Sequence, residues 1–181
     1  MADQIFTSIS NSLQEAVKNP NHPFSYVSLA TVGLSKTPRL RTVVLRSVDK
    51  DLNMTFYTDS RSKKVTHIRE NSNVSLLFFH PEKLMQFYVK GHASIVTDPE
   101  MLQCLWDEIP EKSKKDYISE LGPGTKINKN SRIEYLHKDN YFCVVQIITD
   151  KIEYLELKQP NHLRVEYRKE TSGWEGTYLV P

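Results

Sequence analysis

The stretch Arg41-Thr-Val-Val-Leu-Arg46 has an apolar, β-branched centre with a cation at each end. This composition is typical of a β-strand. Side chains alternate along a strand, so Arg39 and Arg41 share a face, whereas Arg46 points to the opposite face unless the strand is bent. A cation in so apolar a strand is costly unless an anion or a carboxylate meets it. The stretch therefore indicates either an anion site or solvated arginines at a sheet edge, and spacing alone leaves both open.

A second informative stretch, Tyr57-Thr-Asp-Ser-Arg-Ser-Lys-Lys64, lies where a strand ends and a short helix begins. The helix is predicted over 62–70, with Ser60 or Ser62 as its N-cap. A helix N-terminus offers free N–H groups and a partial positive charge. Ser62, Lys63 and Lys64 add a hydroxyl and two ammonium groups, a combination that suits a phosphate monoester. The alternative is an ordinary capped helix with a solvated basic turn.

Around these two stretches the hydrophobic period predicts mainly strands. The expected strands cover 25–32, 39–48, 54–58, 74–79, 84–96, 142–148, 151–157, 163–169 and 174–179. Helices are expected over 3–18, 62–70, 98–108 and 112–121, and an exposed loop over 126–140. So many strands must close or stack to hide their edges. We expect a mainly β chain with peripheral helices, folded as a small antiparallel barrel.

Composition excludes several classes of protein. Among 181 residues, 39% are hydrophobic and 25% charged, which are ordinary values for a globular domain. The net charge of +2 is too weak to indicate a nucleic-acid partner, and no window approaches the roughly 18 apolar residues of a membrane span. The N-terminus does not read as a secretory signal, so a cytoplasmic protein is expected. Neither Cys104 and Cys143 nor the histidines show metal-ligand spacing, so no metal is expected.

Several motifs resemble the pyridoxamine 5′-phosphate oxidase-like split-barrel family. The segments 41–46, Phe56-Tyr-Thr-Asp59 and Ser62-Lys-Lys64 look like its FMN-binding signature. Ser75-Leu-Leu-Phe-Phe79 with Gln86-Phe-Tyr-Val-Lys-Gly91 is similar to its central strands, and Arg164-Val-Glu-Tyr-Arg-Lys-Glu170, Trp174 and Leu179-Val-Pro181 to its C-terminal end. The resemblance covers 25–96 and 152–181. It implies an antiparallel split β-barrel, with 1–181 as one domain made of an N-terminal helix (1–18), a helical insertion (98–121) and closing strands (142–181).

The resemblance also implies a role for each matching residue. Arg41, Ser62, Lys63 and Lys64 would hold the FMN phosphate. Tyr57 and Thr58, with main-chain groups of Thr42, Val43, Val44 and Leu45, would line the ribityl chain and ring. Arg46 stands where the oxidases usually have lysine, Gln86 would hydrogen-bond the isoalloxazine edge, and Arg164 would reach the flavin from near the C-terminus. The family builds this site between two subunits, so a homodimer is implied.

The match fails where the true oxidases bind their substrate. They hold its phosphate with a tyrosine, an arginine and a serine, at positions that align here with Leu105, Ile109 and Ser113. Of their C-terminal Arg-x-His pair, the arginine falls on Pro160, and only His162 remains as a weak catalytic candidate. We expect an FMN-dependent oxidoreductase with a small-molecule substrate other than pyridoxamine phosphate. The alternatives are a genuine oxidase whose phosphate site is rebuilt from Lys112, Lys114 and Lys115, a flavin-binding protein without turnover, and a barrel that holds haem or another ligand.

Overall fold

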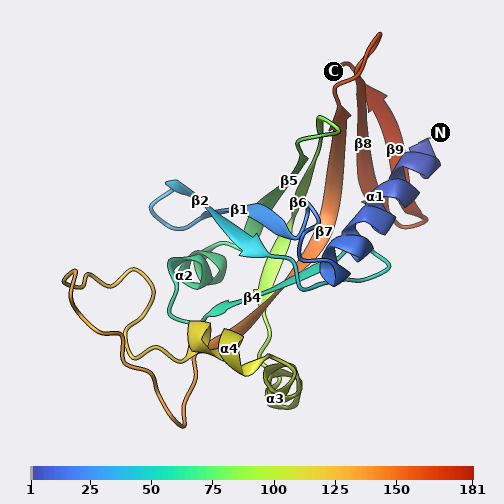
Figure 1. The fold of residues 1–181 in the computed structure, drawn as a ribbon. Coiled ribbons are helices and arrows are strands. Elements are labelled where there is room, and N and C mark those ends of the chain that lie inside the picture. The colour runs from blue at the N-terminus through green and yellow to red at the C-terminus, as the bar shows by residue number, and fades with distance from the viewer. Residues whose placement is uncertain (1) are drawn as a thin grey trace.

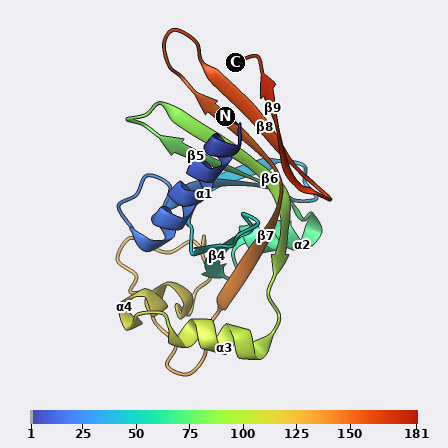
Figure 2. The same cartoon turned by 90° about the vertical axis from the view of Figure 1, so that its right-hand side faces the viewer.

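The structure is a computed structural model that describes residues 2–181. Its described strands form one antiparallel sheet of nine strands in the order β2-β1-β5-β6-β7-β4-β3, with β8 paired to β7 and β9 to β8. The strands are β1 (Tyr26–Val32), β2 (Pro38–Val44), β3 (Ser47–Val48), β4 (Met54–Asp59), β5 (Asn73–His80), β6 (Met85–Ile95), β7 (Phe142–Glu156), β8 (Leu163–Glu170) and β9 (Gly173–Leu179). The sheet curls into a half-barrel (Figure 2), as expected from the sequence.

The curl follows from the connection between β2 and β3. These strands lie at the two ends of the hydrogen-bonded strand path, yet only Leu45 and Arg46 separate them along the chain. The three steps from Val44 to Ser47 span at most about 10 Å, so the two edges must come together. The Leu45 N–H donates to Ser25 O at 2.9 Å, and the Arg46 N–H donates to Thr55 O at 2.9 Å. This crossing joins the β1–β2 hairpin to β4.

The inner face of the sheet carries the hydrophobic core. Alternate residues of the central strands are buried, among them Leu29, Leu76, Phe78, Phe87 and Val89. Helix α1 (Ala2–Lys18) completes this core. It lies inside the curl of the sheet (Figure 2) and buries Ile9, Leu13 and Ala16. The first turn of α1 packs beside the C-terminal hairpin, where the Tyr167 hydroxyl donates to Ala2 O at 2.7 Å.

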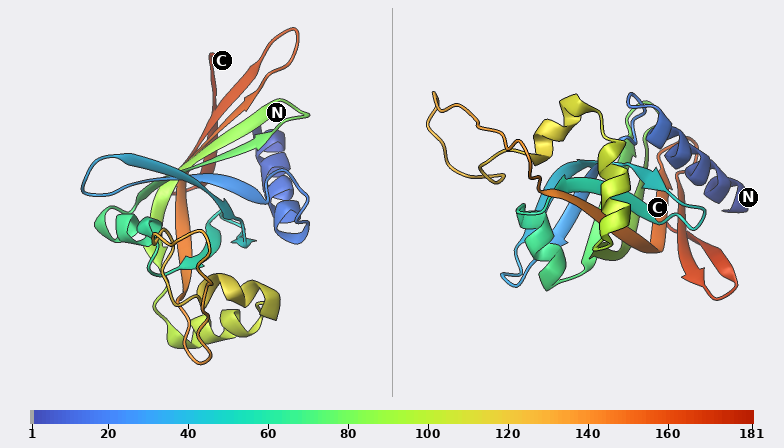
Figure 3. Two further views of the ribbon diagram at one scale, coloured as in Figure 1. Left: turned by 60° about the vertical axis from the view of Figure 1, so that its left-hand side comes forward. Right: turned by 90° about the horizontal axis from the view of Figure 1, so that it is seen from below.

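Of the other helices, those that follow β6 lie at the end of the molecule opposite the C-terminal hairpin (Figures 1 and 2), and the helix that follows β4 packs beside β1 and β6. They are α2 (Lys63–Glu70), α3 (Pro99–Asp107), α4 (Glu111–Lys114) and the 3-10 turn η1 (Lys115–Tyr117). The Asp98 side chain caps α3 by accepting from the N–H groups of Glu100 and Met101, as the Asp-Pro sequence predicts. The segment 118–141 extends from this end as a long loop (Figure 3). No helix within 2–181 is long and apolar enough to cross a membrane.

Three predictions of local structure are wrong. The expected strand 39–48 breaks at Leu45 and Arg46, because these residues cross between sheet edges. The expected strands 142–148 and 151–157 are one strand, β7, which passes through the expected break with a shift of register: Lys151 pairs with Lys90 and Thr149 with Gly91, so Asp150 is the extra residue. The helical insertion ends at Tyr117 rather than at 121, and its second helix shortens to α4 and η1.

Candidate functional site

The first turn of α2 forms a cationic corner against the end of β4. Ser62 is the N-cap residue, is 4% exposed, and its side chain makes no capping hydrogen bond. Its Oγ lies 3.3 Å from the Oγ1 of Thr58, and the Lys64 Nζ donates to that same Oγ1 at 2.8 Å. Within the described chain, the backbone N–H groups of Lys63 and Lys64 have no acceptor. The corner therefore collects hydroxyl, ammonium and amide donors at one point.

Arg41 approaches this corner from β2. It pairs across the hairpin with Leu29, which is buried, so the guanidinium lies on the inner face of the sheet. Its Nη1 donates to Thr31 Oγ1 at 2.7 Å and to Leu29 O at 3.3 Å. The Nε and Nη2 groups have no acceptor in the described chain. Two guanidinium nitrogens are thus free to bind an anion.

The charges in the corner are partly uncompensated. Burial lowers the pKa of Lys64, and the positive charge of Arg41 lowers this pKa further. Burial and the neighbouring Arg39 also lower the pKa of Arg41. Asp59 opposes the effect on Lys64, but this carboxylate is already paired with Arg61 at 2.7 Å. Two half-buried cations held close together favour an anion between them.

Arg61 points away from the corner although it lies within the basic stretch. Its Nη1 and Nη2 donate to the carbonyl oxygens of Glu120 and Ser119 at 2.8 and 2.9 Å, and its guanidinium lies 3.3 Å from the centroid of the Tyr141 ring. Together with its ion pair to Asp59, these contacts use the whole side chain. Arg61 therefore anchors the 118–141 loop to the end of β4.

Arg46 and Tyr57 border a separate pocket of about 240 Å³. The Arg46 guanidinium lies 5.4 Å from the centroid of the Tyr57 ring, and burial raises the pKa of the Tyr57 hydroxyl. The rest of the lining comes from α3, α4 and their connection: Leu105, Glu108, Ile109, Pro110 and Ser113. The three residues that align with the substrate-phosphate ligands of the oxidases thus line one pocket. Only Ser113 among these three carries a polar side chain.

The residues between Arg41 and Arg46 hold the strand in place. Val43 and Leu45 are buried, and Thr42 is exposed on the outer face. The N–H of Leu45 already donates within the barrel, so it is not free for a ligand.

Gln86 and Arg164 lie on the other face of the sheet. They flank Leu155 in the β6–β7–β8 register, so these three side chains share a face. That face is opposite to the inner face of Arg41 and Leu29, where the core side chains point. Arg164 is held by Glu153, whose Oε1 accepts from Nη2 at 2.7 Å. The predicted FMN residues therefore separate within one chain into two groups, and Gln86 and Arg164 do not meet the cationic corner.

His162 is exposed in the connection between β7 and β8. This hairpin lies at the end of the molecule remote from α3 and α4 (Figure 1). His162 thus stays apart from both the cationic corner and the Arg46 pocket.

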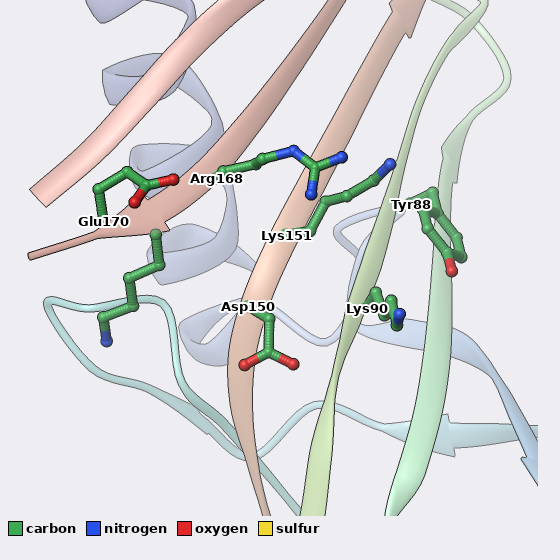
Figure 4. A pocket seen from close by; sticks show the side chains of 7 residues that line it. Tyr88, Lys90, Asp150, Lys151, Arg168 and Glu170 are labelled. Atoms are coloured by element: carbon green, nitrogen blue, oxygen red, sulfur yellow. The ribbon is translucent and has the colours of Figure 1, made fainter.

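A larger cavity of about 440 Å³ lies over β6, β7 and β8 and is lined by charged residues (Figure 4). Two of its cations are paired with one carboxylate: Lys151 pairs with Glu166, and Arg168 pairs with the same carboxylate at 2.6 Å. None of the residues predicted to bind FMN lines this cavity.

Sequence reasoning missed Thr31, His67 and Glu108. Thr31 and His67 are 1% and 7% exposed and stand directly behind Arg41. The spacing of His67 three residues after Lys64 puts both on one side of α2 and was an available signal. Glu108 lines the Arg46 pocket, and nothing in its local sequence distinguishes it from other helix-end carboxylates.

The curled antiparallel sheet defines a split barrel as the class of this protein. Residues 7–97 match the family model described as "Pyridoxamine 5'-phosphate oxidase, FMN-binding domain". The chain therefore belongs to the pyridoxamine 5′-phosphate oxidase FMN-binding family.

Named relatives support this family assignment, at low sequence identity. Pyridoxine/pyridoxamine 5′-phosphate oxidase 2 of Arabidopsis thaliana is 24% identical over 153 residues, 77% of each chain. The pyridoxine/pyridoxamine 5′-phosphate oxidase of Psychrobacter cryohalolentis is 27% identical over 177 residues, which cover 89% of this chain and 81% of that one.

Solved structures confirm the fold. A pyridoxamine 5′-phosphate oxidase-related, FMN binding protein from Nostoc punctiforme PCC 73102 superposes with a TM-score of 0.78 at 22% identity, over 97% of this chain and 96% of that one. PhzG from Burkholderia lata 383, in complex with tetrahydrophenazine-1-carboxylic acid, gives a TM-score of 0.76 at 17% identity, over 97% and 92%.

FMN is the cofactor of this family domain. The donor set fits its phosphate: two adjacent cations with lowered pKa values, the free amides of Lys63 and Lys64, and the Ser62 hydroxyl, which makes no capping hydrogen bond. A phosphate dianion would relieve the repulsion between Arg41 and Lys64.

Proposed function

We propose that the chain is an FMN-dependent oxidoreductase that acts on a small organic molecule lacking a phosphate group. The observation that carries this proposal is the pocket beside Arg46 and Tyr57, which is lined by Leu105 and Ile109, the two apolar residues that align in sequence with substrate-phosphate ligands of the oxidases. Each charge-assisted hydrogen bond contributes about 1.5–3 kcal/mol. Losing two of them weakens phosphate binding by on the order of a hundredfold or more.

In this proposal Arg41, Ser62, Lys63 and Lys64 would hold the phosphate of FMN, and Tyr57, Thr58, main-chain groups of 42–45 and Arg46 would line its ribityl chain and ring. The bound flavin supplies the hydride chemistry. The chain's own residues orient it: the cationic corner fixes the phosphate end, and Arg46 offers a positive charge at the other end. Fixed donors of this kind stabilise developing negative charge without reorganisation.

A second copy of the chain would complete the site. Gln86 and Arg164 share the outer face of the sheet with exposed apolar side chains, including Leu77 and Phe79, which are 41% and 50% exposed. An apolar sheet face of this kind favours burial against a partner. A homodimer that covers this face would bring Gln86 and Arg164 of one subunit to the flavin held by the other.

The pocket itself favours a ligand with an apolar body. Leu105, Ile109 and Pro110 give it apolar walls, Arg46 offers one cation, and Glu108 adds a carboxylate that disfavours a dianion. Its neighbour in fold, PhzG, holds a ring carboxylic acid, a ligand that has an apolar body and a single negative charge. We propose the same chemical class, an aromatic or alicyclic compound with at most one negative charge, for this pocket.

The test is a turnover assay on the FMN-loaded protein. Reduction of the flavin by NADH, NADPH or an amine, without peroxide release from pyridoxine phosphate, supports the proposal. Turnover of pyridoxine phosphate with release of peroxide would make the chain a genuine oxidase. Bound FMN that none of these donors reduces would favour a flavin-binding protein without turnover.

A further inference from the structure

A buried hydrogen-bonded chain links α2 to Arg41 behind the cationic corner. His67 is 7% exposed, and its Nδ1 lies 3.1 Å from the Oγ1 of Thr31, which is 1% exposed. Thr31 Oγ1 in turn accepts from Arg41 Nη1 at 2.7 Å. Lys64 and His67 are three residues apart on α2, so one side of this helix contacts both the corner and the residue behind it.

The direction of the hydrogen bonds follows from the chemistry of the groups. A guanidinium only donates, so Thr31 Oγ1 must be the acceptor from Arg41. The single proton of the Thr31 hydroxyl is then free to be donated to His67 Nδ1, which accepts when the neutral imidazole carries its proton on Nε2. The chain runs from Arg41 to Thr31 to His67 with every bond satisfied.

The imidazole is also held in place by its packing. A Cβ built on Gly33 would lie 2.7 Å from His67 Cδ2, so the end of β1 closes against the ring. Close packing of a buried ring restricts its rotation. The acceptor that orients the Thr31 hydroxyl is therefore fixed before any ligand binds.

We propose that His67 is a positioning residue for the cofactor phosphate, acting through Thr31 on Arg41. The chain holds Nη1 against β1 and leaves Nε and Nη2 directed to the anion. An arginine side chain loses considerable rotamer entropy when it is fixed, and a guanidinium oriented in advance has already lost it. The inference rests on the proposed assignment of the FMN phosphate to Arg41 and Lys64, and it does not depend on turnover.

The experiment compares the dissociation constants of FMN and riboflavin, which differ by the phosphate, for the apoprotein and its variants. Thr31→Val is nearly isosteric and removes the hydroxyl, and His67→Leu removes the acceptor. Both are expected to weaken FMN binding about tenfold, or about 1.4 kcal/mol, and to leave riboflavin binding within about twofold of wild type. His67→Gln, whose amide oxygen accepts a hydrogen bond, is expected to restore most of the FMN affinity.

The control variant is Lys64→Ala, which removes a phosphate ligand directly. If Lys64→Ala lowers the preference for FMN over riboflavin while Thr31→Val and His67→Leu leave it unchanged, the positioning role is overturned and the phosphate site stands. If Lys64→Ala also leaves this preference unchanged, the phosphate assignment itself is wrong. Equal loss of FMN and riboflavin binding in Thr31→Val would assign the chain of hydrogen bonds a structural role only and overturn the inference.

Discussion

Lys64 Nζ donates to the Oγ1 of Thr58 at 2.8 Å. This hydrogen bond joins the first turn of α2 to the end of strand β4 through a side chain that also belongs to the cationic corner. An ammonium has three donors, and this bond uses one of them. The remaining two are held at a fixed position for an anion. The corner is thus preformed, with its lysine directed by a hydroxyl on the neighbouring strand.

The first prediction concerns the pH dependence of FMN binding. Burial and Arg41 lower the pKa of Lys64 from its ordinary 10.5, so the free protein loses this proton at a lower pH than an exposed lysine would. A bound phosphate dianion favours the ammonium and raises this pKa again. Binding therefore takes up a proton between the two pKa values, and the FMN dissociation constant rises with pH across that alkaline window, at most about tenfold per pH unit.

Titrations of wild type and Lys64→Gln at a series of pH values check this prediction. The variant lacks the titrating group, so its FMN affinity is expected to stay flatter over the same alkaline range. Parallel pH profiles for the two proteins would contradict an FMN phosphate bound to Lys64.

The second prediction concerns the pocket beside Arg46. Ile109 is 8% exposed and aligns with an arginine of the oxidases. Ile109→Arg restores one charge-assisted hydrogen bond to a substrate phosphate, worth about 1.5 kcal/mol. Pyridoxal phosphate is expected to bind about tenfold more tightly to this variant than to wild type, measured by its quenching of protein fluorescence.

Ile109→Gln is the matched control for this substitution, because it has a long polar side chain without the charge. If both variants bind pyridoxal phosphate equally, the pocket does not correspond to the substrate-phosphate site of the oxidases.

The third prediction concerns Arg61. Removing it leaves Asp59, which is 4% exposed, without its ion-pair partner and frees the 118–141 loop from β4. Arg61→Ala is expected to lower the free energy of unfolding by about 1.5–3 kcal/mol, measured by denaturant titration, while the ratio of FMN to riboflavin affinity stays close to wild type.

Lys63→Ala, on the exposed side of the same turn, is the comparison for stability and is expected to change it by less than about 0.5 kcal/mol. A loss of FMN preference in Arg61→Ala as large as in Lys64→Ala would place Arg61 at the phosphate, against its observed contacts.

Much of this fold was predictable because its signals are local. Alternation identified most of the strands, and Asp98-Pro99 marked the start of α3. The break at Leu45 and Arg46 was not predictable in this way, since the two residues have strand-like side chains and only the closure of the curled sheet takes them out of a strand. The continuity of β7 through Thr149 likewise depends on a distant partner, because its hydroxyl donates to Leu52 O at 2.6 Å.

The candidate site shows the same difference between local signals, which were predictable, and contacts between distant segments, which were not. The basic turn at Ser62–Lys64 was visible as a motif, because strand end, cap and cations are adjacent in sequence. The direction of Arg61, which lies in the same motif, depends on a loop nearly sixty residues away. Thr31 was not predictable for a similar reason: it is an ordinary β-strand residue until the fold brings it beside Arg41 and His67, and the helical spacing of His67 from Lys64 alone does not show that contact.

The most direct test of the account is an absorption spectrum of the purified protein, followed by titration of wild type and Arg41→Ala/Lys64→Ala with FMN and riboflavin. The account predicts a flavin spectrum for wild type and FMN binding that is weakened in the variant by about a hundredfold or more, with riboflavin binding little changed. A colourless protein that does not bind FMN, or a variant that binds FMN as tightly as wild type, would contradict it.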